Sequence, residues 1–258
     1  MSHDSAIFLS DAHLGISIPG AEQREQALVA FLKEIQGQVD HLFLLGDIFD
    51  FWIEYRHAVR PDYFHVLFAL RNLRDSGVKL HYLPGNHDFA LGPVLSQATG
   101  MILHGQELDI LLQGKRLLLS HGDRFVETGP IHSLIFHILR SRRNQRLFKL
   151  LHPNIGIPLA KWISGLSRRC VENGVKPNVP KAYQTIGRQY LDNGFDMVIL
   201  GHTHFPERVE DKGKVYVNTG EWIKTYCYAE LKQGQLRLWE FLGPGRRRQI
   251  SNLFPLMA

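Results

Sequence analysis

Long apolar runs and cysteines are the features that this sequence lacks most clearly. No stretch of its 258 residues approaches the roughly 20 apolar residues that cross a bilayer, so we expect no transmembrane helix. The N-terminus has no basic region followed by a long apolar segment, so we expect no secretory signal. The two cysteines, Cys170 and Cys227, lie far apart and form no CxxC pair, which favours a reduced, cytoplasmic setting without a structural disulfide.

The remaining composition is that of a globular protein. Hydrophobic residues make up 44% and charged residues 21% of the chain, and residues 1–258 are enough for a single domain that carries an insertion. The charge is unevenly distributed, because residues 125–194 hold eleven lysines and arginines against three acidic residues. The whole chain has a formal net charge of +5, so its basic excess lies in this one segment, which predicts an anionic partner there.

Short apolar runs alternate with helical patterns at the start of the chain. We predict strands at Ala6–Ser10, His41–Leu45 and Lys79–Leu83, and helices at Glu22–Gln36 and Pro61–Asp75, an alternation typical of a mostly parallel sheet. We also expect a helix to begin within Phe89–Ala98, and residues 125–194 have a helical pattern. Residues 243–258 show no clear element. Later strands are predicted at Glu107–Leu112, Lys115–Ser120, Met197–Leu200, Arg208–Glu210, Lys214–Asn218, Thr225–Leu231 and Gln235–Phe241.

Five short polar motifs each follow a predicted strand. An aspartate at a strand end is commonly a turn or capping residue, and a lone histidine is usually structural, but five such motifs together make that interpretation weak. Because the carboxyl ends of parallel strands meet at one edge of a sheet, we expect the motifs to converge. They are Asp11-x-His13, Gly46-Asp47, Gly85-Asn86-His87-Asp88, His121-Gly122 and His202-x-His204.

The side chains of these motifs have the chemistry of a metal centre. They supply carboxylates, imidazoles and an amide but no thiolate, a set that suits Mn, Fe, Zn, Co or Ni rather than Ca or an iron–sulfur cluster. Seven ligands are too many for one ion and suit two ions about 3.5–4 Å apart that share a carboxylate. The sequence therefore predicts a site for two divalent metal ions.

The motifs resemble those of the calcineurin-like metallophosphoesterases, which carry DxH, GD, GNH[DE], GH and GHxH in this order. All five are intact between Asp11 and His204. The resemblance implies a four-layer α/β/β/α sandwich that hydrolyses a phosphoester or phosphoanhydride with a metal-activated water. It also implies that one metal is held by Asp11, His13 and His204, the other by Asn86, His121 and His202, and that the two are bridged by Asp47.

The same resemblance gives roles to the two residues that follow Asn86. His87 is expected to act on the phosphate, as a hydrogen-bond donor or general acid, and not to bind metal. Asp88 is expected to fix the orientation and tautomer of the His87 imidazole, and it is also placed to act as a charge at a helix N-terminus.

Three longer stretches resemble a narrower group, the UDP-2,3-diacylglucosamine diphosphatases. They are Gly46–Ile53, Leu151–Gly156 and Gly220–Ile223. This resemblance implies cleavage of the pyrophosphate of UDP-2,3-diacylglucosamine to UMP and 2,3-diacylglucosamine 1-phosphate in lipid A biosynthesis, with Mn²⁺ as the metal and a helical cap around the acyl chains. At His87 the chain instead matches the wider superfamily, because the best-known diphosphatases have arginine there.

The basic segment 125–194 is the expected cap. Apolar residues between Ile131 and Leu139 repeat at helical spacing and are followed by cations from Arg140 to Lys149. A basic amphipathic helix favours contact with anionic lipid on the inner face of the cytoplasmic membrane, although a helix packed on the core with a solvated charged face has the same pattern. Candidate substrate contacts are Ser164, Ser167, Arg168, Arg169, Lys176 and Lys181.

Two other functions fit parts of the sequence. A soluble phosphodiesterase or nuclease would use the same metals, and a basic segment attracts phosphate backbones. Few aromatic residues lie between the cations, however, so the expected partner is a lipid-linked UDP-sugar and not nucleic acid. A non-catalytic scaffold is disfavoured because all seven ligands are intact, and no feature indicates an obligate protein partner.

Overall fold

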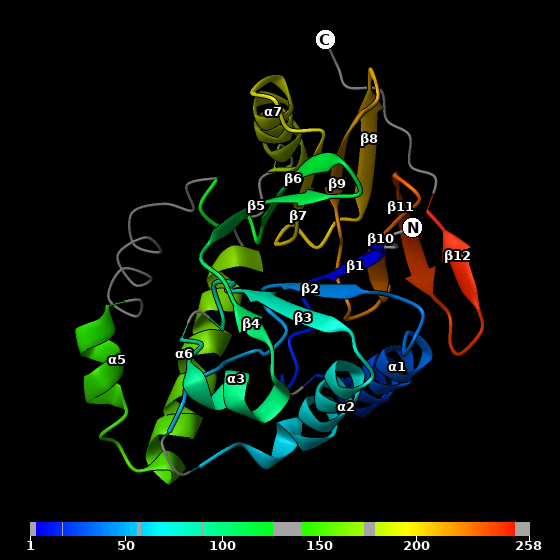
Figure 1. Cartoon of the computed structure of the whole chain (residues 1–258). Coiled ribbons are helices and arrows are strands. Elements are labelled where there is room, and N and C mark those ends of the chain that lie inside the picture. Colours follow the sequence, from blue (N-terminus) through cyan, green and yellow to red (C-terminus); the bar gives the residue numbers. More distant parts are fainter. Residues whose placement is uncertain are drawn as a thin grey trace.

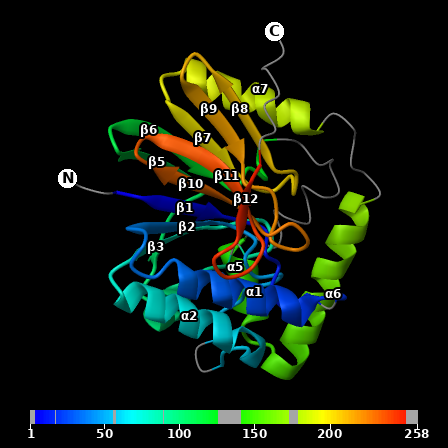
Figure 2. The ribbon, with the colours of Figure 1, turned by 90° about the vertical axis from the view of Figure 1, so that its right-hand side faces the viewer.

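Two β-sheets lie face to face between outer layers of helices (Figures 1 and 2). The computed structural model describes residues 4–16, 18–55, 58–88, 90–125, 141–172 and 179–250, without the side chains of Arg142 and of residues 163–172. The predicted four-layer α/β/β/α architecture is confirmed. Within the described residues, no helix is both long and apolar enough to cross a membrane.

The first sheet has seven strands in the order β12-β11-β10-β1-β2-β3-β4. Its parallel half consists of β1 (Ala6–Leu9), β2 (His41–Leu45), β3 (Lys79–Leu83) and β4 (Ile102–Leu103). Its antiparallel half consists of β10 (Cys227–Lys232), β11 (Gln235–Phe241) and β12 (Arg247–Gln249). β1 and β2 are buried along their whole length, which explains why their sequences are continuous apolar runs.

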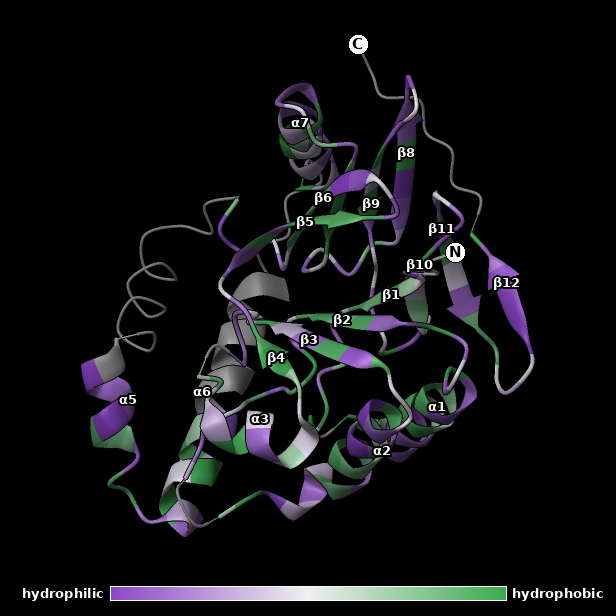
Figure 3. Cartoon of the chain, in the orientation of Figure 1, coloured by the Kyte–Doolittle hydropathy of each residue, from purple (hydrophilic) through white to green (hydrophobic). Residues whose placement is uncertain are grey.

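The second sheet has five strands in the order β5-β6-β7-β9-β8. Its central strands, β6 (Lys115–Ser120), β7 (Met197–Leu200) and β9 (Lys214–Asn218), run parallel to one another. The edge strands, β5 (Glu107–Leu112) and β8 (Glu207–Asp211), pair antiparallel with their neighbours. Figure 3 shows apolar residues on the central strands of both sheets.

The helices cover the outer faces of the sheets. The first sheet is covered by α1 (Ala21–Glu34), η1 (Pro61–Tyr63), α2 (Phe64–Asp75) and α3 (Pro93–Thr99), which share an apolar core with it. The second sheet is covered by α7 (Val179–Asp192). A third core fills the space between the sheets. Two further helices, α5 (Arg142–Phe148) and α6 (Pro153–Glu172), stand beside the layers (Figures 1 and 2).

The segment 125–194 is thus divided between two environments. α7 packs against the second sheet, where Tyr183 and Leu191 join the core formed with Leu118, Val198 and Tyr216. Only α5 and α6 remain as described helices of the expected cap, whose limits stay a prediction. Residues 126–140, which contain the predicted apolar repeat from Ile131 to Leu139 and Arg140, lie outside the described residues.

Three local features of the structure were predicted differently or not at all. The helix expected within Phe89–Ala98 begins only at Pro93, which suits the first turn of a helix because it has no N–H to satisfy there. The two-residue strand β4 is too short to give a periodic pattern. The tail, expected to have no element, forms β12, in which Arg247 and Arg248 lie 3.1 Å and 2.5 Å from the carboxylates of Glu230 and Glu240.

Candidate functional site

The loops that follow β1, β2, β3, β6 and β7 come together at the carboxyl ends of these strands, as the topology predicts. Backbone hydrogen bonds join them: Asp11 N–H donates to Gly46 O at 3.1 Å, and His13 N–H donates to Asp47 O at 2.9 Å. The second sheet is tied to the first because His202 N–H donates to the Asp11 carboxylate at 2.9 Å. The seven expected ligands are therefore brought to one place from both sheets.

The backbone at these ligands is strained. Among the described residues, nine that are not glycine have positive φ, and five of them are expected ligands. Their φ angles are 54° at Asp11, 43° at His13, 54° at Asp47, 71° at His202 and 58° at His204. This left-handed region is costly for residues with a Cβ, and such strain gathers at functional sites, where the surrounding fold holds it in place.

A first cluster contains Asp11, His13 and His204. Nε2 of His204 lies 3.2 Å from Oδ1 of Asp11 and 3.3 Å from Nε2 of His13. Asp11 and His13 are buried, whereas His204 is exposed. One ligand atom from each residue lies within 4.8 Å of the others, which is close enough for the three to hold one ion.

A second cluster contains Asp47, His121 and His202, with Asn86 beside them. Nε2 of His121 lies 3.4 Å from Oδ2 of Asp47, 3.2 Å from Nδ1 of His202 and 3.0 Å from Oδ1 of Asn86. Oδ2 of Asp47 also lies 3.8 Å from Nε2 of His13 in the first cluster. Asp47 is thus placed between the clusters, where a bridging carboxylate would be.

The charges of the clusters shift one another's pKa values. Burial would lower the pKa of His13, but the carboxylates of Asp11, Asp50 and Asp47 raise it to about 10. Burial would raise the pKa of Asp47, but His121 and His87 hold it well below its usual range. The carboxylates are therefore held in their ionised form and favour positive charge beside them, which bound cations would supply.

The donor set fits divalent metal ions. Oδ1 of Asp11 and Nδ1 of His13 are buried, yet neither has a hydrogen-bond partner among the described residues. A buried carboxylate oxygen without a partner is costly, and a cation would satisfy it. Oxygen and imidazole ligands without thiolate suit Mn²⁺ and similar ions.

The structure gives His87 a partner other than the expected Asp88. Nδ1 of His87 lies 3.1 Å from the carbonyl oxygen of Asp50 and 3.9 Å from its carboxylate, which is also 3.8 Å from Nδ1 of His13. The Asp88 carboxylate instead accepts the N–H groups of Gly85 at 2.9 Å and of Ile48 at 2.9 Å. Asp88 therefore holds two loops together, and Asp50 is the carboxylate that faces both imidazoles.

Asp50 and Tyr183 were not identified from the sequence. A second aspartate three residues after Asp47 was visible in Gly46–Asp50, but nothing in the sequence indicated which way its carboxylate points. Tyr183 lies on α7, donates to Gly122 O at 2.9 Å and has its ring 6.2 Å from that of His202. Only the packing of α7 against the second sheet brings it to the site.

The candidate substrate contacts are only partly described. Lys181 is exposed on α7, two residues before Tyr183. Ser164, Ser167, Arg168 and Arg169 lie on α6 with side chains outside the described set, and Lys176 lies outside the described residues altogether. Their contacts with substrate stay a prediction.

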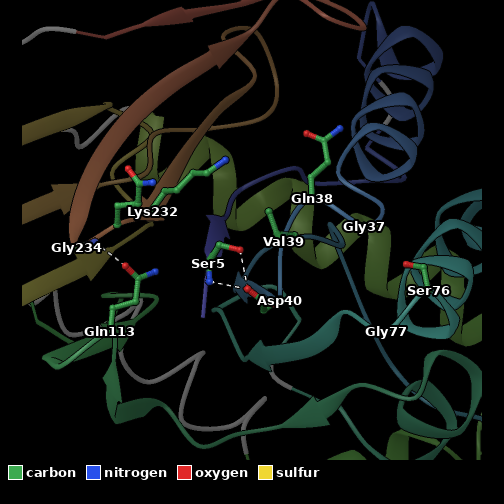
Figure 4. Close-up of a pocket in the computed structure, with 11 residues that line it drawn as sticks. Ser5, Gly37, Gln38, Val39, Asp40, Ser76, Gly77, Gln113, Lys232 and Gly234 are labelled. Carbon is green, nitrogen blue, oxygen red and sulfur yellow. Dashed lines mark hydrogen bonds between the residues drawn. The ribbon is translucent and has the colours of Figure 1, made fainter. Parts of the chain in front are cut away.

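A separate pocket lies at the amino ends of β1, β2 and β3, opposite the candidate site (Figure 4). Its volume is about 910 Å³, and Ser5, Asp40 and Lys232 are among the residues that line it. Oδ2 of Asp40 accepts the Ser5 N–H and hydroxyl groups at 2.8 Å each. None of the expected metal ligands lines this pocket, so it is distinct from the candidate site.

Comparison with known proteins finds similar chains. A family model described as calcineurin-like phosphoesterase matches residues 5–206. The chain is 30% identical to a UDP-2,3-diacylglucosamine hydrolase of Porphyromonas gingivalis, with 86% of this chain and 92% of that protein covered. It is also 30% identical to the hydrolase of that name from Aeromonas salmonicida, with 96% and 100% covered. A solved phosphoesterase from E. coli aligns with a TM-score of 0.48 and 17% identity over 96% of this chain and 97% of that one.

The family model spans most of the chain, and all five motifs of the family converge in the structure. The chain therefore belongs to the calcineurin-like phosphoesterase family and is a hydrolase of phosphoester or diphosphate bonds.

Proposed function

We propose that the protein hydrolyses the pyrophosphate of UDP-2,3-diacylglucosamine to UMP and 2,3-diacylglucosamine 1-phosphate, with two Mn²⁺ ions bound by the seven expected ligands. The observation that carries the proposal is the pair of clusters with Asp47 between them, in a chain 30% identical to hydrolases named for this substrate. The enzyme would thus act in lipid A biosynthesis.

The residues of the chain divide the work of this reaction. One ion would be held by Asp11, His13 and His204. The other would be held by Asn86, His121 and His202, and Asp47 would bind both ions. Bound metal ions supply an activated water and neutralise charge on the phosphoryl oxygens. The carbonyl oxygen of Asp50 lies 3.1 Å from Nδ1 of His87 and would orient the imidazole, and a protonated His87 would donate to a phosphoryl oxygen or to the leaving group.

We further propose that α5 and α6 contact the inner face of the cytoplasmic membrane, where the diacylated substrate resides. Leu150 is 81% exposed, Ile155 61% and Trp162 63%, which is unusual for three large apolar side chains so close in sequence. Arg143, Arg146 and Lys149 on and next to α5 add positive charge that suits anionic lipid. Figure 3 shows α5 as mainly hydrophilic and the start of α6 as more apolar.

The substrate assignment predicts a dependence on acyl chains. With Mn²⁺, the protein should release UMP from UDP-2,3-diacylglucosamine at least about tenfold faster, in kcat/KM, than from the deacylated UDP-sugar, because apolar contacts worth about 1.5–3 kcal/mol each are lost. UMP is measured by chromatography, with EDTA as the control. Equal rates on both substrates, or faster cleavage of DNA or of an aryl phosphodiester, would exclude the lipid substrate.

The membrane assignment predicts a loss of binding when the exposed apolar surface is made polar. The double variant Leu150→Asp/Ile155→Asp should bind vesicles containing anionic lipid at least about tenfold more weakly, since each buried aliphatic side chain contributes about 1.5–3 kcal/mol. Binding is measured by co-sedimentation. Leu111→Asp is the matched control, because Leu111 is 69% exposed but lies on β5, an edge strand of the second sheet, and not on α5 or α6. Equal binding by the two variants would contradict the proposal.

A further inference from the structure

Three histidines away from the candidate metal site form a row across the first sheet. His41 begins β2, His81 lies in β3 and His104 follows β4. Nδ1 of His41 is 3.1 Å from Nε2 of His81, and Nδ1 of His81 is 3.0 Å from Nε2 of His104. The rings are nearly parallel, at 24° and 22° to each other. The row therefore crosses three adjacent parallel strands (Figure 1).

Two of the three histidines are buried at the level of the inter-sheet core, and His104 is half-buried. His41 and His81 are each 6% exposed, and the His81 ring stacks on Phe43 at 4.3 Å. Burial lowers the pKa of all three histidines, and burial together with the neighbouring His41, His104 and Lys79 lowers the pKa of His81 to about 4. The fold therefore favours the neutral imidazoles.

The hydrogen-bond pattern limits how many protons the row can hold. Each N···N contact accommodates one hydrogen, and each end of the row has one further ring nitrogen. The neutral row has three hydrogens, which fill the two contacts and one end. One added proton fills the other end, but a second must place two N–H groups against each other in one contact. The folded row thus accepts at most one proton, whereas three free histidines accept three.

We propose that this row of hydrogen-bonded histidines holds β2, β3 and β4 together at neutral pH and that acid weakens it. β2 leads directly into Gly46-Asp47 and β3 into Gly85-Asn86-His87, so strands that separate on protonation would take the loops of the candidate metal site with them. With this row, the fraction of folded protein would fall more steeply as the pH is lowered than it would with three isolated histidines. It depends on the row and not on the identity of the substrate.

The charged groups that face the row act mainly on His41. Oδ1 of Asp4 lies 3.9 Å from Nε2 of His41, and Asp4 and Asp40 favour its charged form, whereas Lys79 disfavours it. Lys79 also disfavours a charge on His81. The single proton that the row can hold is therefore best placed toward the Asp4 end.

The sign of the pH dependence follows from the lowered pKa values. Below the ordinary histidine pKa of about 6.5 the unfolded chain binds more protons than the folded row, so stability falls as the pH falls from about 6.5 toward 4. A difference of two protons raises the unfolding equilibrium constant by up to about 100-fold per unit of pH. Above about 6.5 the row contributes no pH dependence.

Equilibrium urea unfolding of the full chain between pH 7 and 4.5 tests this inference. In the wild type, the row should change the unfolding equilibrium constant by up to about 100-fold per unit of pH. In His104→Gln this change should be about 10-fold, because glutamine can donate or accept at that contact. In His81→Phe the remaining two imidazoles no longer touch, so only the burial of His41 and His104 still lowers their pKa values, and the dependence on pH should be smaller than in the wild type. Other titrating groups, including those of the metal site, contribute equally to every variant.

His65→Gln is the matched control, because His65 is an exposed histidine on α2. This variant should show the same change of the unfolding equilibrium constant with pH as the wild type. If His81→Phe fails to fold, His104→Gln alone decides the outcome. NMR of the folded wild type should show His81 still neutral at pH 5. The proposal would be overturned if the unfolding equilibrium constant changed equally with pH in all of these proteins, or if His81 titrated near pH 6.5 in the folded state.

Discussion

Replacing Asp47 with alanine is expected to abolish metal-dependent hydrolysis, with a loss in kcat on the order of 10³ or more. Oδ2 of Asp47 is the atom that approaches both clusters, at 3.8 Å from His13 and 3.4 Å from His121, and the side chain is 2% exposed. Its removal leaves each cluster short of a carboxylate and the two clusters unconnected. The bound metal should therefore fall together with the activity.

Asp47→Asn separates the two tasks of this side chain. Oδ1 of Asp47 accepts the His87 N–H at 2.8 Å, and the asparagine oxygen can keep that bond while the charge is lost. We expect Asp47→Asn to fold like the wild type but to bind less metal, measured by elemental analysis after gel filtration. Asp75→Asn, an exposed carboxylate at the end of α2, is the control. Full activity of Asp47→Ala with two bound metals would refute the assignment of the site.

The sequence predicted those parts of the fold that local physics determines. β1, β2 and β7 are buried on both faces, so each must be a continuous apolar run, and the ligand motifs follow directly from their carboxyl ends. The five motifs also resemble those of the calcineurin-like family in type and order, which is why the seven expected ligands could be named from the sequence. Their convergence required only that the strands be parallel.

Other features depend on contacts that no local pattern encodes. An amphipathic helix such as α7 has the same periodicity whether its apolar face meets a sheet or a lipid, so its place in the outer layer could not be predicted. The strand β12 has no apolar alternation, and its cations are partnered by Glu230 and Glu240 on two other strands. The orienting role of Asp50 and the row of three histidines likewise arise from residues that lie far apart in the chain.

Replacing Gly85 with alanine is expected to inactivate the enzyme nearly as completely as the loss of Asp47. A Cβ at Gly85 would lie 2.1 Å from Oδ1 and 2.6 Å from the backbone nitrogen of Asp47, distances that no carbon contact tolerates. The loops after β2 and β3 must therefore separate, which displaces Asp47 from His13 and His121 and also moves Asn86 and His87. Because shifts of about 1 Å at a catalytic site can cost 10²-fold, we expect a loss in kcat/KM of at least about 10².

Gly105→Ala is the matched control, because no atom lies within 4 Å of a Cβ at Gly105 and its φ is not in the left-handed region. It should keep wild-type activity, metal content and thermal midpoint. Gly85→Ala should lower all three, since Asp88 accepts the Gly85 N–H at 2.9 Å and also fastens the Ile48 backbone. Normal metal content and activity in Gly85→Ala would contradict the close contact between the loops after β2 and β3.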